Sequence, residues 1–210
     1  MELKVFKFDG SETAKSVSLM DEMFAIEPND HAMWLDVKQL LANRRQGTHC
    51  TKEKSTLSGS TRKIKKQKGT GGARAGSIKN PLFRGGARIF GPQPRLYGFK
   101  LNKKVKQLAR YSALSYKAKN QDLIVVEDFT FDQPKTKNYS EFLSNFDLVD
   151  KKTLLIVSES NKNVYLSSRN LKGSNVVSVT DINTYDIMNA SKLIFFESSL
   201  EKLQNTQVSE

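Results

Sequence analysis

The sequence predicts an α/β fold: a three-layer α/β/α sandwich around a mainly parallel sheet, interrupted by a long, basic, extended loop. Three observations lead to this prediction. Short apolar runs alternate with segments of helical periodicity in the C-terminal half, as is typical of βαβ units. Apolar periodicity disappears between residues 47 and 101. Residues 44–110 hold 19 of the 34 Lys and Arg, a single acid (Glu53) and ten of the 12 glycines.

The N-terminal residues predict two short strands. Residues 3–8 are rich in apolar and aromatic side chains and precede Asp9-Gly10, which is a turn signal. Residues 16–19 predict the second, smaller strand.

An amphipathic helix of about 16 residues is expected after Pro28, because apolar side chains recur there at three- to four-residue spacing. These side chains are Met33, Trp34, Val37, Leu40 and Leu41. We expect Arg44 and Arg45 in the last turn of this helix, where cations interact favourably with the helix dipole, and we expect Gly47 to end it.

Residues 47–101 form, on this prediction, a loop far longer than a compact domain normally contains. Glycine-rich breaks separate its polar and basic residues, as in Lys68-Gly69-Thr70-Gly71-Gly72. A segment so charged and so poor in apolar residues cannot bury a core of its own, so we expect it to become ordered on a densely anionic partner. The sequence therefore predicts a discontinuous globular domain over residues 1–46 and 102–210, and an extended basic loop over residues 47–101.

Order is expected to resume at Asn102, a suitable N-cap for a helix that ends near Lys119. Four apolar runs follow, and each predicts a strand buried on both faces of a parallel sheet. These runs are Leu123–Val126, Leu154–Val157, Val176–Val179 and Leu193–Phe196. The segments between and after them predict helices over residues 139–146, 164–171, 185–190 and 198–204.

The overall charge indicates a polyanionic partner. The net charge of +12 and the pI near 9.7 favour nucleic acid first and an anionic membrane second. The single cysteine, Cys50, excludes an internal disulfide framework and fits a reducing compartment. The chain has neither the pattern of a signal peptide nor an apolar run long enough to span a bilayer, so we expect a soluble, cytoplasmic protein.

The residues show no catalytic or metal-binding constellation. No Gly-x-Gly-x-x-Gly follows a strand, and no phosphate-binding P-loop is present. His31 and His49 lack partners at zinc-like spacing, and Cys50 lacks a predicted histidine base. Glu127-Asp128 follows a predicted strand, where catalytic acids occur, but a solvated turn is the favoured interpretation. We predict no enzyme activity, no cofactor and no metal.

Two alternatives remain beside nucleic-acid binding. One is an RNA-modifying or nucleotide-binding α/β enzyme with a basic substrate loop, which needs a cofactor motif at the carboxyl edge of the sheet. The other is a basic membrane-surface protein, which needs an apolar face opposite the cations.

Nucleic acid explains the loop best, because Lys and Arg neutralise phosphates and release counterions. Aromatic residues are interleaved with these cations, and each could stack on a base or pack against protein: Phe83, Phe90, Tyr97 and Phe99. For Tyr97 and Phe99, which lie near the end of the loop, packing against the globular domain is the favoured alternative.

Several motifs of the loop and the C-terminal half resemble the L-four family of large-subunit ribosomal proteins. In the loop these are Arg45-Gln46-Gly47-Thr48, Gln67-Lys68-Gly69-Thr70-Gly71, Ala73-Arg74-Ala75-Gly76-Ser77, Asn80-Pro81 and Arg84-Gly85-Gly86. Beyond it they are Leu123-Ile124-Val125-Val126-Glu127, Pro134-Lys135-Thr136-Lys137 and Ser168-Arg169-Asn170-Leu171. The chain departs from the bacterial pattern at Ile64-Lys65, where relatives often have Pro-Trp, and at Gly72, which replaces a common Arg.

The resemblance implies a structural protein of the large ribosomal subunit, in the cytoplasm, that binds large-subunit (23S-type) rRNA directly and supports early assembly. It also implies that the loop threads the RNA and that its tip forms part of the wall of the polypeptide exit tunnel. The expected partners are large-subunit rRNA, neighbouring large-subunit proteins and, at the tip, the nascent polypeptide; no membrane and no small-molecule substrate are expected.

The predicted site residues fall into two sets. The expected rRNA-binding cations are Arg44, Arg45, Lys52, Lys54, Arg62, Lys63, Lys65, Lys66, Lys68, Arg74, Lys79, Arg84, Arg88, Arg95, Lys100, Lys103 and Lys104. The expected tunnel-tip residues are Lys65, Lys66, Gln67, Lys68, Gly69, Thr70, Gly71, Gly72 and Arg74.

Overall fold

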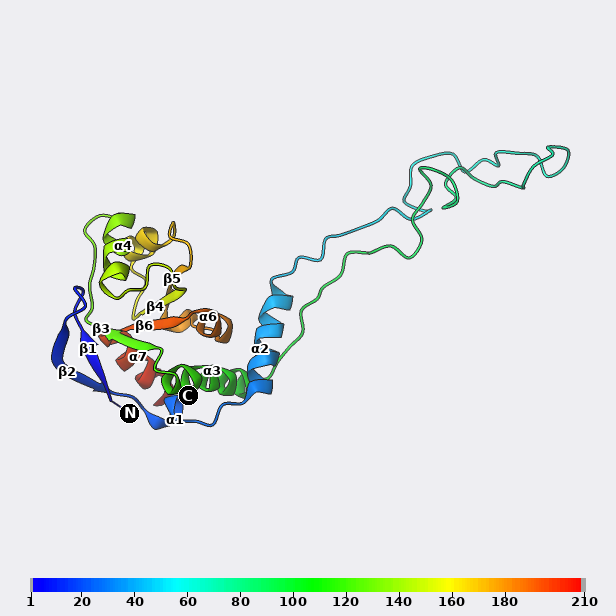
Figure 1. Ribbon diagram of the computed structural model, residues 1–210. Helices are drawn as coiled ribbons and strands as arrows, with labels where there is room; N and C mark the ends of the chain where they lie inside the picture. The colour runs from blue at the N-terminus through cyan, green and yellow to red at the C-terminus, as the bar shows by residue number, and fades with distance from the viewer. Residues whose placement is uncertain (1, 209–210) are drawn as a thin grey trace. The chain divides into compact units, whose positions relative to one another are not determined.

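The computed structural model describes residues 2–208, with the side chains of residues 2–205 (Figure 1). The chain divides into two compact units. The first, called the body below, comprises residues 1–40 and 100–210. The second, called the arm, comprises residues 41–99.

The body contains a six-stranded sheet in the order β2-β1-β3-β6-β4-β5. The first two strands pair antiparallel, and all the other pairs are parallel. This sheet, with its covering helices, confirms the predicted α/β fold class. The strands are β1 (Glu2–Phe6), β2 (Glu12–Ser18), β3 (Leu123–Val126), β4 (Thr153–Val157), β5 (Ser174–Ser178) and β6 (Lys192–Phe196).

Seven α-helices and one short 3-10 helix lie within residues 2–208. They are α1 (Asp21–Phe24), α2 (Asp30–Asn43), α3 (Lys103–Lys119), α4 (Thr136–Asn145), α5 (Lys162–Ser168), η1 (Val179–Asp181), α6 (Thr184–Asn189) and α7 (Glu197–Val208). The structure differs from the predictions in three ways. The helix α1 was not predicted from the sequence. The placement of Arg44 and Arg45 in the last turn of α2 is wrong, and Gly47 does not end that helix, because it ends at Asn43.

The helices cover both faces of the sheet, as Figure 1 shows. The core of one face joins the sheet to buried side chains of α1, α2, α3, α6 and α7, and the core of the other joins it to α4 and α5. Alternate residues of a strand enter opposite cores: Leu154 and Ile156 lie in the first, Leu155 and Val157 in the second. The prediction of strands buried on both faces is therefore confirmed for β3, β4 and β6. It is wrong for the run Val176–Val179, because β5 is an edge strand whose valines are half-buried and Val179 begins η1.

Two buried serines of α3 fix the segment that leads into α2. The Ser115 hydroxyl oxygen accepts the N–H of Ile26 at 3.2 Å, and that of Ser112 accepts the N–H of Asn29 at 3.1 Å. Asn29 in turn caps α2, because its side-chain oxygen accepts the N–H of Ala32 at 2.9 Å. The N–H groups of Ile26 and Asn29, which no helix or strand bonds, thus find acceptors in α3, and the start of α2 is held in the body.

Candidate nucleic-acid interface

The arm is a hairpin without regular strands. Figure 1 shows its outgoing and returning segments running side by side and closing at a turn. Hydrogen bonds join the two segments at intervals, with donor–acceptor distances of 2.9–3.1 Å. These bonds run from Arg95 N–H to Gly47 O, Thr51 N–H to Pro92 O, Arg88 N–H to Lys52 O, Ser77 Oγ–H to Ser60 O, and Ile64 N–H to Gly76 O.

The cations predicted to bind RNA are almost all exposed. Every one of them is exposed except Lys79, which is half-buried. Those from Arg44 to Arg95 lie on the arm, whereas Lys100, Lys103 and Lys104 belong to the body, the last two in the first turn of α3.

The only acid among residues 41–99 does not neutralise this charge. The Glu53 carboxylate accepts a hydrogen bond from Gln93 Nε2 at 2.9 Å, across the two segments of the arm. Among the residues with described side chains, no ion pair joins Glu53 to a cation of the arm. The arm therefore carries 14 Lys and Arg against one carboxylate, and cations at this density repel one another.

Near the root of the arm, two arginines contact one tyrosine. The guanidinium carbons of Arg45 and Arg95 lie 3.7 Å and 4.5 Å from the centroid of the Tyr97 ring. The Tyr97 hydroxyl is 3.0 Å from Nε2 of His49. Because the residues come from both segments, these contacts close the root.

Gly47 allows the close approach at this root. Its φ is +64°, a conformation that favours glycine, and a Cβ built on it would lie 2.0 Å from the carbonyl oxygen of Arg95. The hydrogen bond from Arg95 to Gly47 depends on this missing side chain.

The middle of the returning segment folds into consecutive turns over residues 77–87. The N–H groups of Asn80, Phe83 and Gly86 each donate to the carbonyl oxygen three residues earlier. Ala87 donates to Lys79 O at 3.1 Å and is 4% exposed, the only buried apolar side chain described between residues 41 and 99. The side-chain carbons of Lys79 lie beside Gly59 of the outgoing segment, which accounts for its lower exposure.

The tip is open to solvent. All residues from Thr61 to Arg74 are exposed, so this range contains every predicted tip residue. Lys63 Nζ donates to Gln67 Oε1, and no heavy atom lies within 4 Å of a Cβ built on Gly69 or Gly71. The structure thus leaves the tip free to meet a partner over its whole surface.

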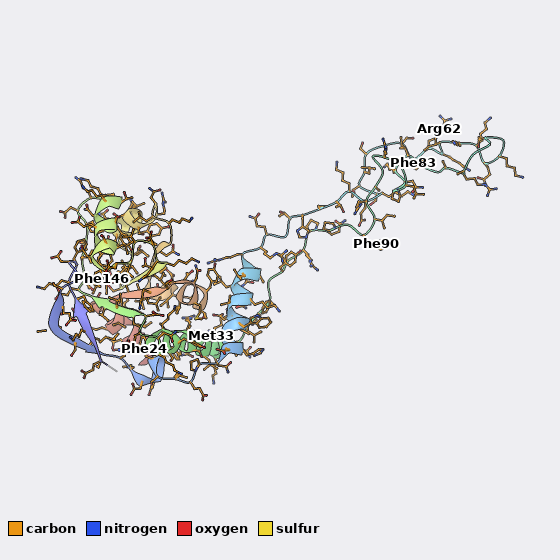
Figure 2. The ribbon with its side chains drawn as sticks, in the orientation of Figure 1. Phe24, Met33, Arg62, Phe83, Phe90 and Phe146 are labelled. Carbon is orange, nitrogen blue, oxygen red and sulfur yellow. The ribbon has the colours of Figure 1, made fainter. Side chains whose placement is uncertain are left out.

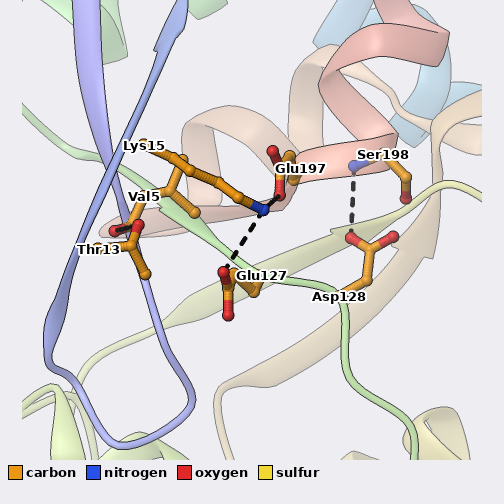
Figure 3. A network of polar contacts seen from close by, with 7 residues as sticks. All are labelled: Val5, Thr13, Lys15, Glu127, Asp128, Glu197 and Ser198. Atoms are coloured by element: carbon orange, nitrogen blue, oxygen red, sulfur yellow. Dashed lines mark hydrogen bonds and ion pairs between the residues drawn. The ribbon is translucent and has the colours of Figure 1, made fainter.

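The acids at the carboxyl edge of the sheet have structural partners (Figure 3). Lys15 Nζ lies 3.6 Å from Glu127 Oε1 and 3.4 Å from Glu197 Oε2. The hydrogen bond and charge of Glu197, with the charge of Glu127, raise the pKa of Lys15. Asp128 Oδ1 accepts the N–H of Ser198 at 3.3 Å, in the first turn of α7. These contacts give Glu127 and Asp128 roles in holding β2, β3 and α7 together.

The described residues contain no further arrangement typical of a metal site or a membrane span. They include no group of three His, Cys, Asp or Glu side chains that could hold a metal ion. His31 stacks on Trp34 at a centroid distance of 6.1 Å, and His49 contacts Tyr97. None of the described helices has both the length and the hydropathy needed to cross a membrane.

Comparison with known proteins identifies the relatives of the chain. Residues 17–206 match the model of the ribosomal protein L4/L1 family. The chain is 59% identical to the large ribosomal subunit protein uL4 of Christiangramia forsetii over 205 residues, which cover 98% of this chain and 99% of the relative. It is 59% identical to the protein of the same name from Flavobacterium johnsoniae over 204 residues, covering 97% and 98% of the two chains. The corresponding Amoebophilus asiaticus protein is 57% identical over 203 residues, covering 97% of each chain.

Proposed function

The chain belongs to the ribosomal protein L4/L1 family, and from this we propose that it is a structural constituent of the large ribosomal subunit that binds the subunit's RNA directly. Its place is then in the large subunit, in the bacterial cytoplasm, as the names of its bacterial relatives indicate. The family is one of structural proteins rather than enzymes.

The charge of the arm is the observation that carries this proposal. Residues 41–99 contain 14 Lys and Arg and one acid, and that acid is held by Gln93. Negative charge supplied from outside the protein would relieve the repulsion between these cations. RNA phosphates supply it at high density, and their neutralisation releases condensed counterions, which favours binding.

The mechanism is electrostatic and geometric. RNA segments that must pack closely repel each other through their phosphates, and a cationic hairpin between them offsets this repulsion. The predicted loop, residues 47–101, thereby supports early assembly of the subunit, and Lys100, Lys103 and Lys104 continue the contact at the start of α3. Neighbouring large-subunit proteins are the expected partners of the body.

The tip of the arm forms, in this proposal, part of the wall of the polypeptide exit tunnel. The family resemblance assigns this role to the residues from Lys65 to Arg74, and their exposure supports it. Lys65, Lys66, Lys68 and Arg74 would face RNA or the nascent polypeptide. No cofactor and no small-molecule substrate are part of this function.

The alternative of an RNA-modifying or nucleotide-binding enzyme is not supported by the acids that it would use. Glu127 and Asp128, the acids at the carboxyl edge of the sheet, are engaged by Lys15 and by the main chain of α7. The alternative of a membrane-surface protein needs a periodic apolar face, which the arm does not have.

The proposal can be tested by measuring how the full-length protein binds in vitro transcribed 23S-type rRNA over a series of salt concentrations. Replacing Lys65 and Lys68 by Gln should weaken binding and reduce the slope of log K against log[salt] by roughly 0.7–0.9 for each phosphate that is no longer neutralised. The matched control replaces Lys151 and Lys172, two exposed lysines of the body, and should leave the slope unchanged. Equal affinity of the wild type for small-subunit rRNA would contradict the proposal.

A further inference from the structure

One aromatic side chain of the arm has no cover within the protein. Phe90 is fully exposed, at 101% of its reference area, whereas Phe83 and Phe99 are 37% and 39% exposed. The ring of Tyr97 is occupied by Arg45, Arg95 and His49. Of the four aromatic residues predicted to stack or pack, only Phe90 is fully exposed; Figure 2 labels it on the arm.

The pairing of the two segments projects Phe90 outward. Arg88 N–H donates to Lys52 O, and Thr51 N–H donates to Pro92 O, both at 3.0 Å. Thr51 and Lys52 are adjacent, yet their partners are four residues apart. Residues 89–91 of the returning segment therefore lie between two paired positions that have no residue between them on the outgoing segment. These three extra residues bulge out, as an insertion does in a strand pair.

The backbone of this bulge has an unusual conformation at Phe90 and a close contact at Gly91. Phe90 has a φ of +53°, in the left-handed region that residues other than glycine rarely adopt. The next residue, Gly91, lies so close to Thr51 that a Cβ on it would be 2.0 Å from Thr51 Oγ1. Gly91 thus lets the returning segment rejoin the outgoing one directly after the bulge, so the backbone that carries the ring is held on both sides.

The surroundings of the bulge indicate what the ring meets. Lys52 and Arg88, whose main chains pair at its base, and nearby Lys54 all have exposed side chains. A planar apolar ring on a bulge with exposed cations at its base fits a ligand that offers a flat π-face within an anionic polymer. An unpaired nucleobase has both properties, because its face stacks on aromatic side chains while its phosphates meet Lys and Arg.

We propose that Phe90 is a stacking platform for an unpaired base of the large-subunit RNA. This inference rests on the proposed function and deepens it, because it assigns to one residue a contact with a base rather than with phosphate. The bulge over residues 89–91 positions the ring, and the neighbouring cations hold the backbone of the same nucleotide strand.

The test compares full-length variants at position 90 for binding to in vitro transcribed 23S-type rRNA. Phe90→Ala is expected to weaken binding by roughly 5- to 150-fold, the effect of losing one base–aromatic stack. The slope of log K against log[salt] should not change, because no charge is removed. Phe90→Tyr should bind RNA as tightly as the wild type. Phe90→Leu has an apolar but not planar side chain, so its affinity should fall nearly as far as that of Phe90→Ala.

A matched control and a second readout make the result specific. Leu96 is 92% exposed in the same segment, and Leu96→Ala should leave the affinity unchanged. Chemical probing of the RNA should show an unpaired base protected by the wild type and by Phe90→Tyr but reactive with Phe90→Ala. Circular dichroism of each variant checks that the body remains folded.

The outcomes separate this inference from the proposed function. If the wild type shows no preference for large-subunit rRNA, the proposed function fails and this inference fails with it. If the wild type binds but Phe90→Ala matches it in affinity and in protection, the inference alone is overturned. Wild-type affinity of Phe90→Leu would also overturn it, since a simple apolar contact, such as a pocket on a neighbouring protein, would then explain the exposed ring.

Discussion

The guanidinium of Arg45 lies over the ring of Tyr97, with its central carbon 3.7 Å from the ring centroid. Arg45 follows α2 at the start of the arm, and Tyr97 stands near its end, so the contact ties the first residues of the arm to the last. Arg95 approaches the same ring at 4.5 Å. Two guanidiniums are thereby held near one point while their N–H groups remain able to bind phosphate.

Removing the Tyr97 ring should loosen this root. The ring makes two exposed cation–π contacts of about 0.5–1 kcal/mol each, so losing both in Tyr97→Leu should speed hydrogen exchange of the Arg95 amide by roughly 5- to 30-fold. Tyr97→Phe keeps the ring but loses the contact with His49, and should have an intermediate effect. Nuclear magnetic resonance of the full-length protein would measure this exchange. Unchanged exchange in Tyr97→Leu would show that the ring does not hold the root.

Substitution of Gly47 should open the root more strongly. In Gly47→Ala, the new Cβ would collide with the carbonyl oxygen of Arg95 and also occupy a backbone conformation that costs about 1 kcal/mol without glycine. We expect loss of the hydrogen bond from Arg95 to Gly47 and an unprotected Arg95 amide. Gly71→Ala is the control, because Gly71 has a similar φ of +61° but open space around it. Equal effects of the two variants on Arg95 would contradict the steric explanation.

Deleting residues 50–95 should leave the body folded. Neither hydrophobic core of the described residues includes a side chain from residues 41–99. The ends of the deletion also lie close together, since Arg95 is hydrogen-bonded to Gly47. Circular dichroism and thermal unfolding should therefore match the full-length protein, while maturation of the large subunit in cells should be perturbed. Unfolding of the shortened protein would show that the body depends on the arm.

The buried phenol of Tyr139 should make stability fall at high pH. Burial raises the pKa of this phenol, and the nearby Ser174 hydroxyl only partly offsets the rise. Above pH 10 the unfolded chain loses the Tyr139 proton while the folded protein keeps it. The contribution of Tyr139 to stability is thus present below the unfolded pKa, about 10, and is lost as pH rises above it.

Tyr139→Phe isolates this effect. The Tyr139 hydroxyl has no hydrogen-bond partner of suitable geometry among the described residues, so its removal should cost nothing at pH 7 or raise stability slightly. Above pH 10 the advantage of the variant should grow with pH in urea unfolding experiments. A constant difference between the two proteins from pH 7 to 11 would contradict the buried, neutral phenol.

The residues themselves predicted most of the secondary structure. The run Leu123–Val126 is β3 to the residue, and the helix expected between Asn102 and Lys119 is α3. Both elements could be predicted because the pattern of apolar side chains that identifies them lies within one continuous stretch of sequence. The helix α1 escaped prediction because four residues are too few to show periodicity. Its Met23 and Phe24 are buried, and the Met23 carbonyl accepts the hydroxyl of Ser115, a residue far along the chain.

The candidate RNA interface was likewise predicted only in part. The sequence predicted a cationic loop, because charge and the lack of apolar residues are properties of composition. It offered four aromatic residues for stacking without ranking them. Contacts between the two segments distinguish them: Arg45 and Arg95 lie over the Tyr97 ring, whereas hydrogen bonds on either side of residues 89–91 leave Phe90 on a bulge. These bonds join residues about 40 positions apart, which no local pattern encodes.

The amino-acid sequence by itself determined that this protein has an α/β body and a cationic segment that cannot form a core, because both follow from side chains read in order. The tertiary structure alone decided that β6 lies between β3 and β4, that β2 closes the edge antiparallel, and which aromatic ring of the arm is left bare. Strand order, strand direction and the exposure of a ring all depend on contacts between segments that are distant in the sequence. These contacts form, and contribute their free energy, only when the chain folds.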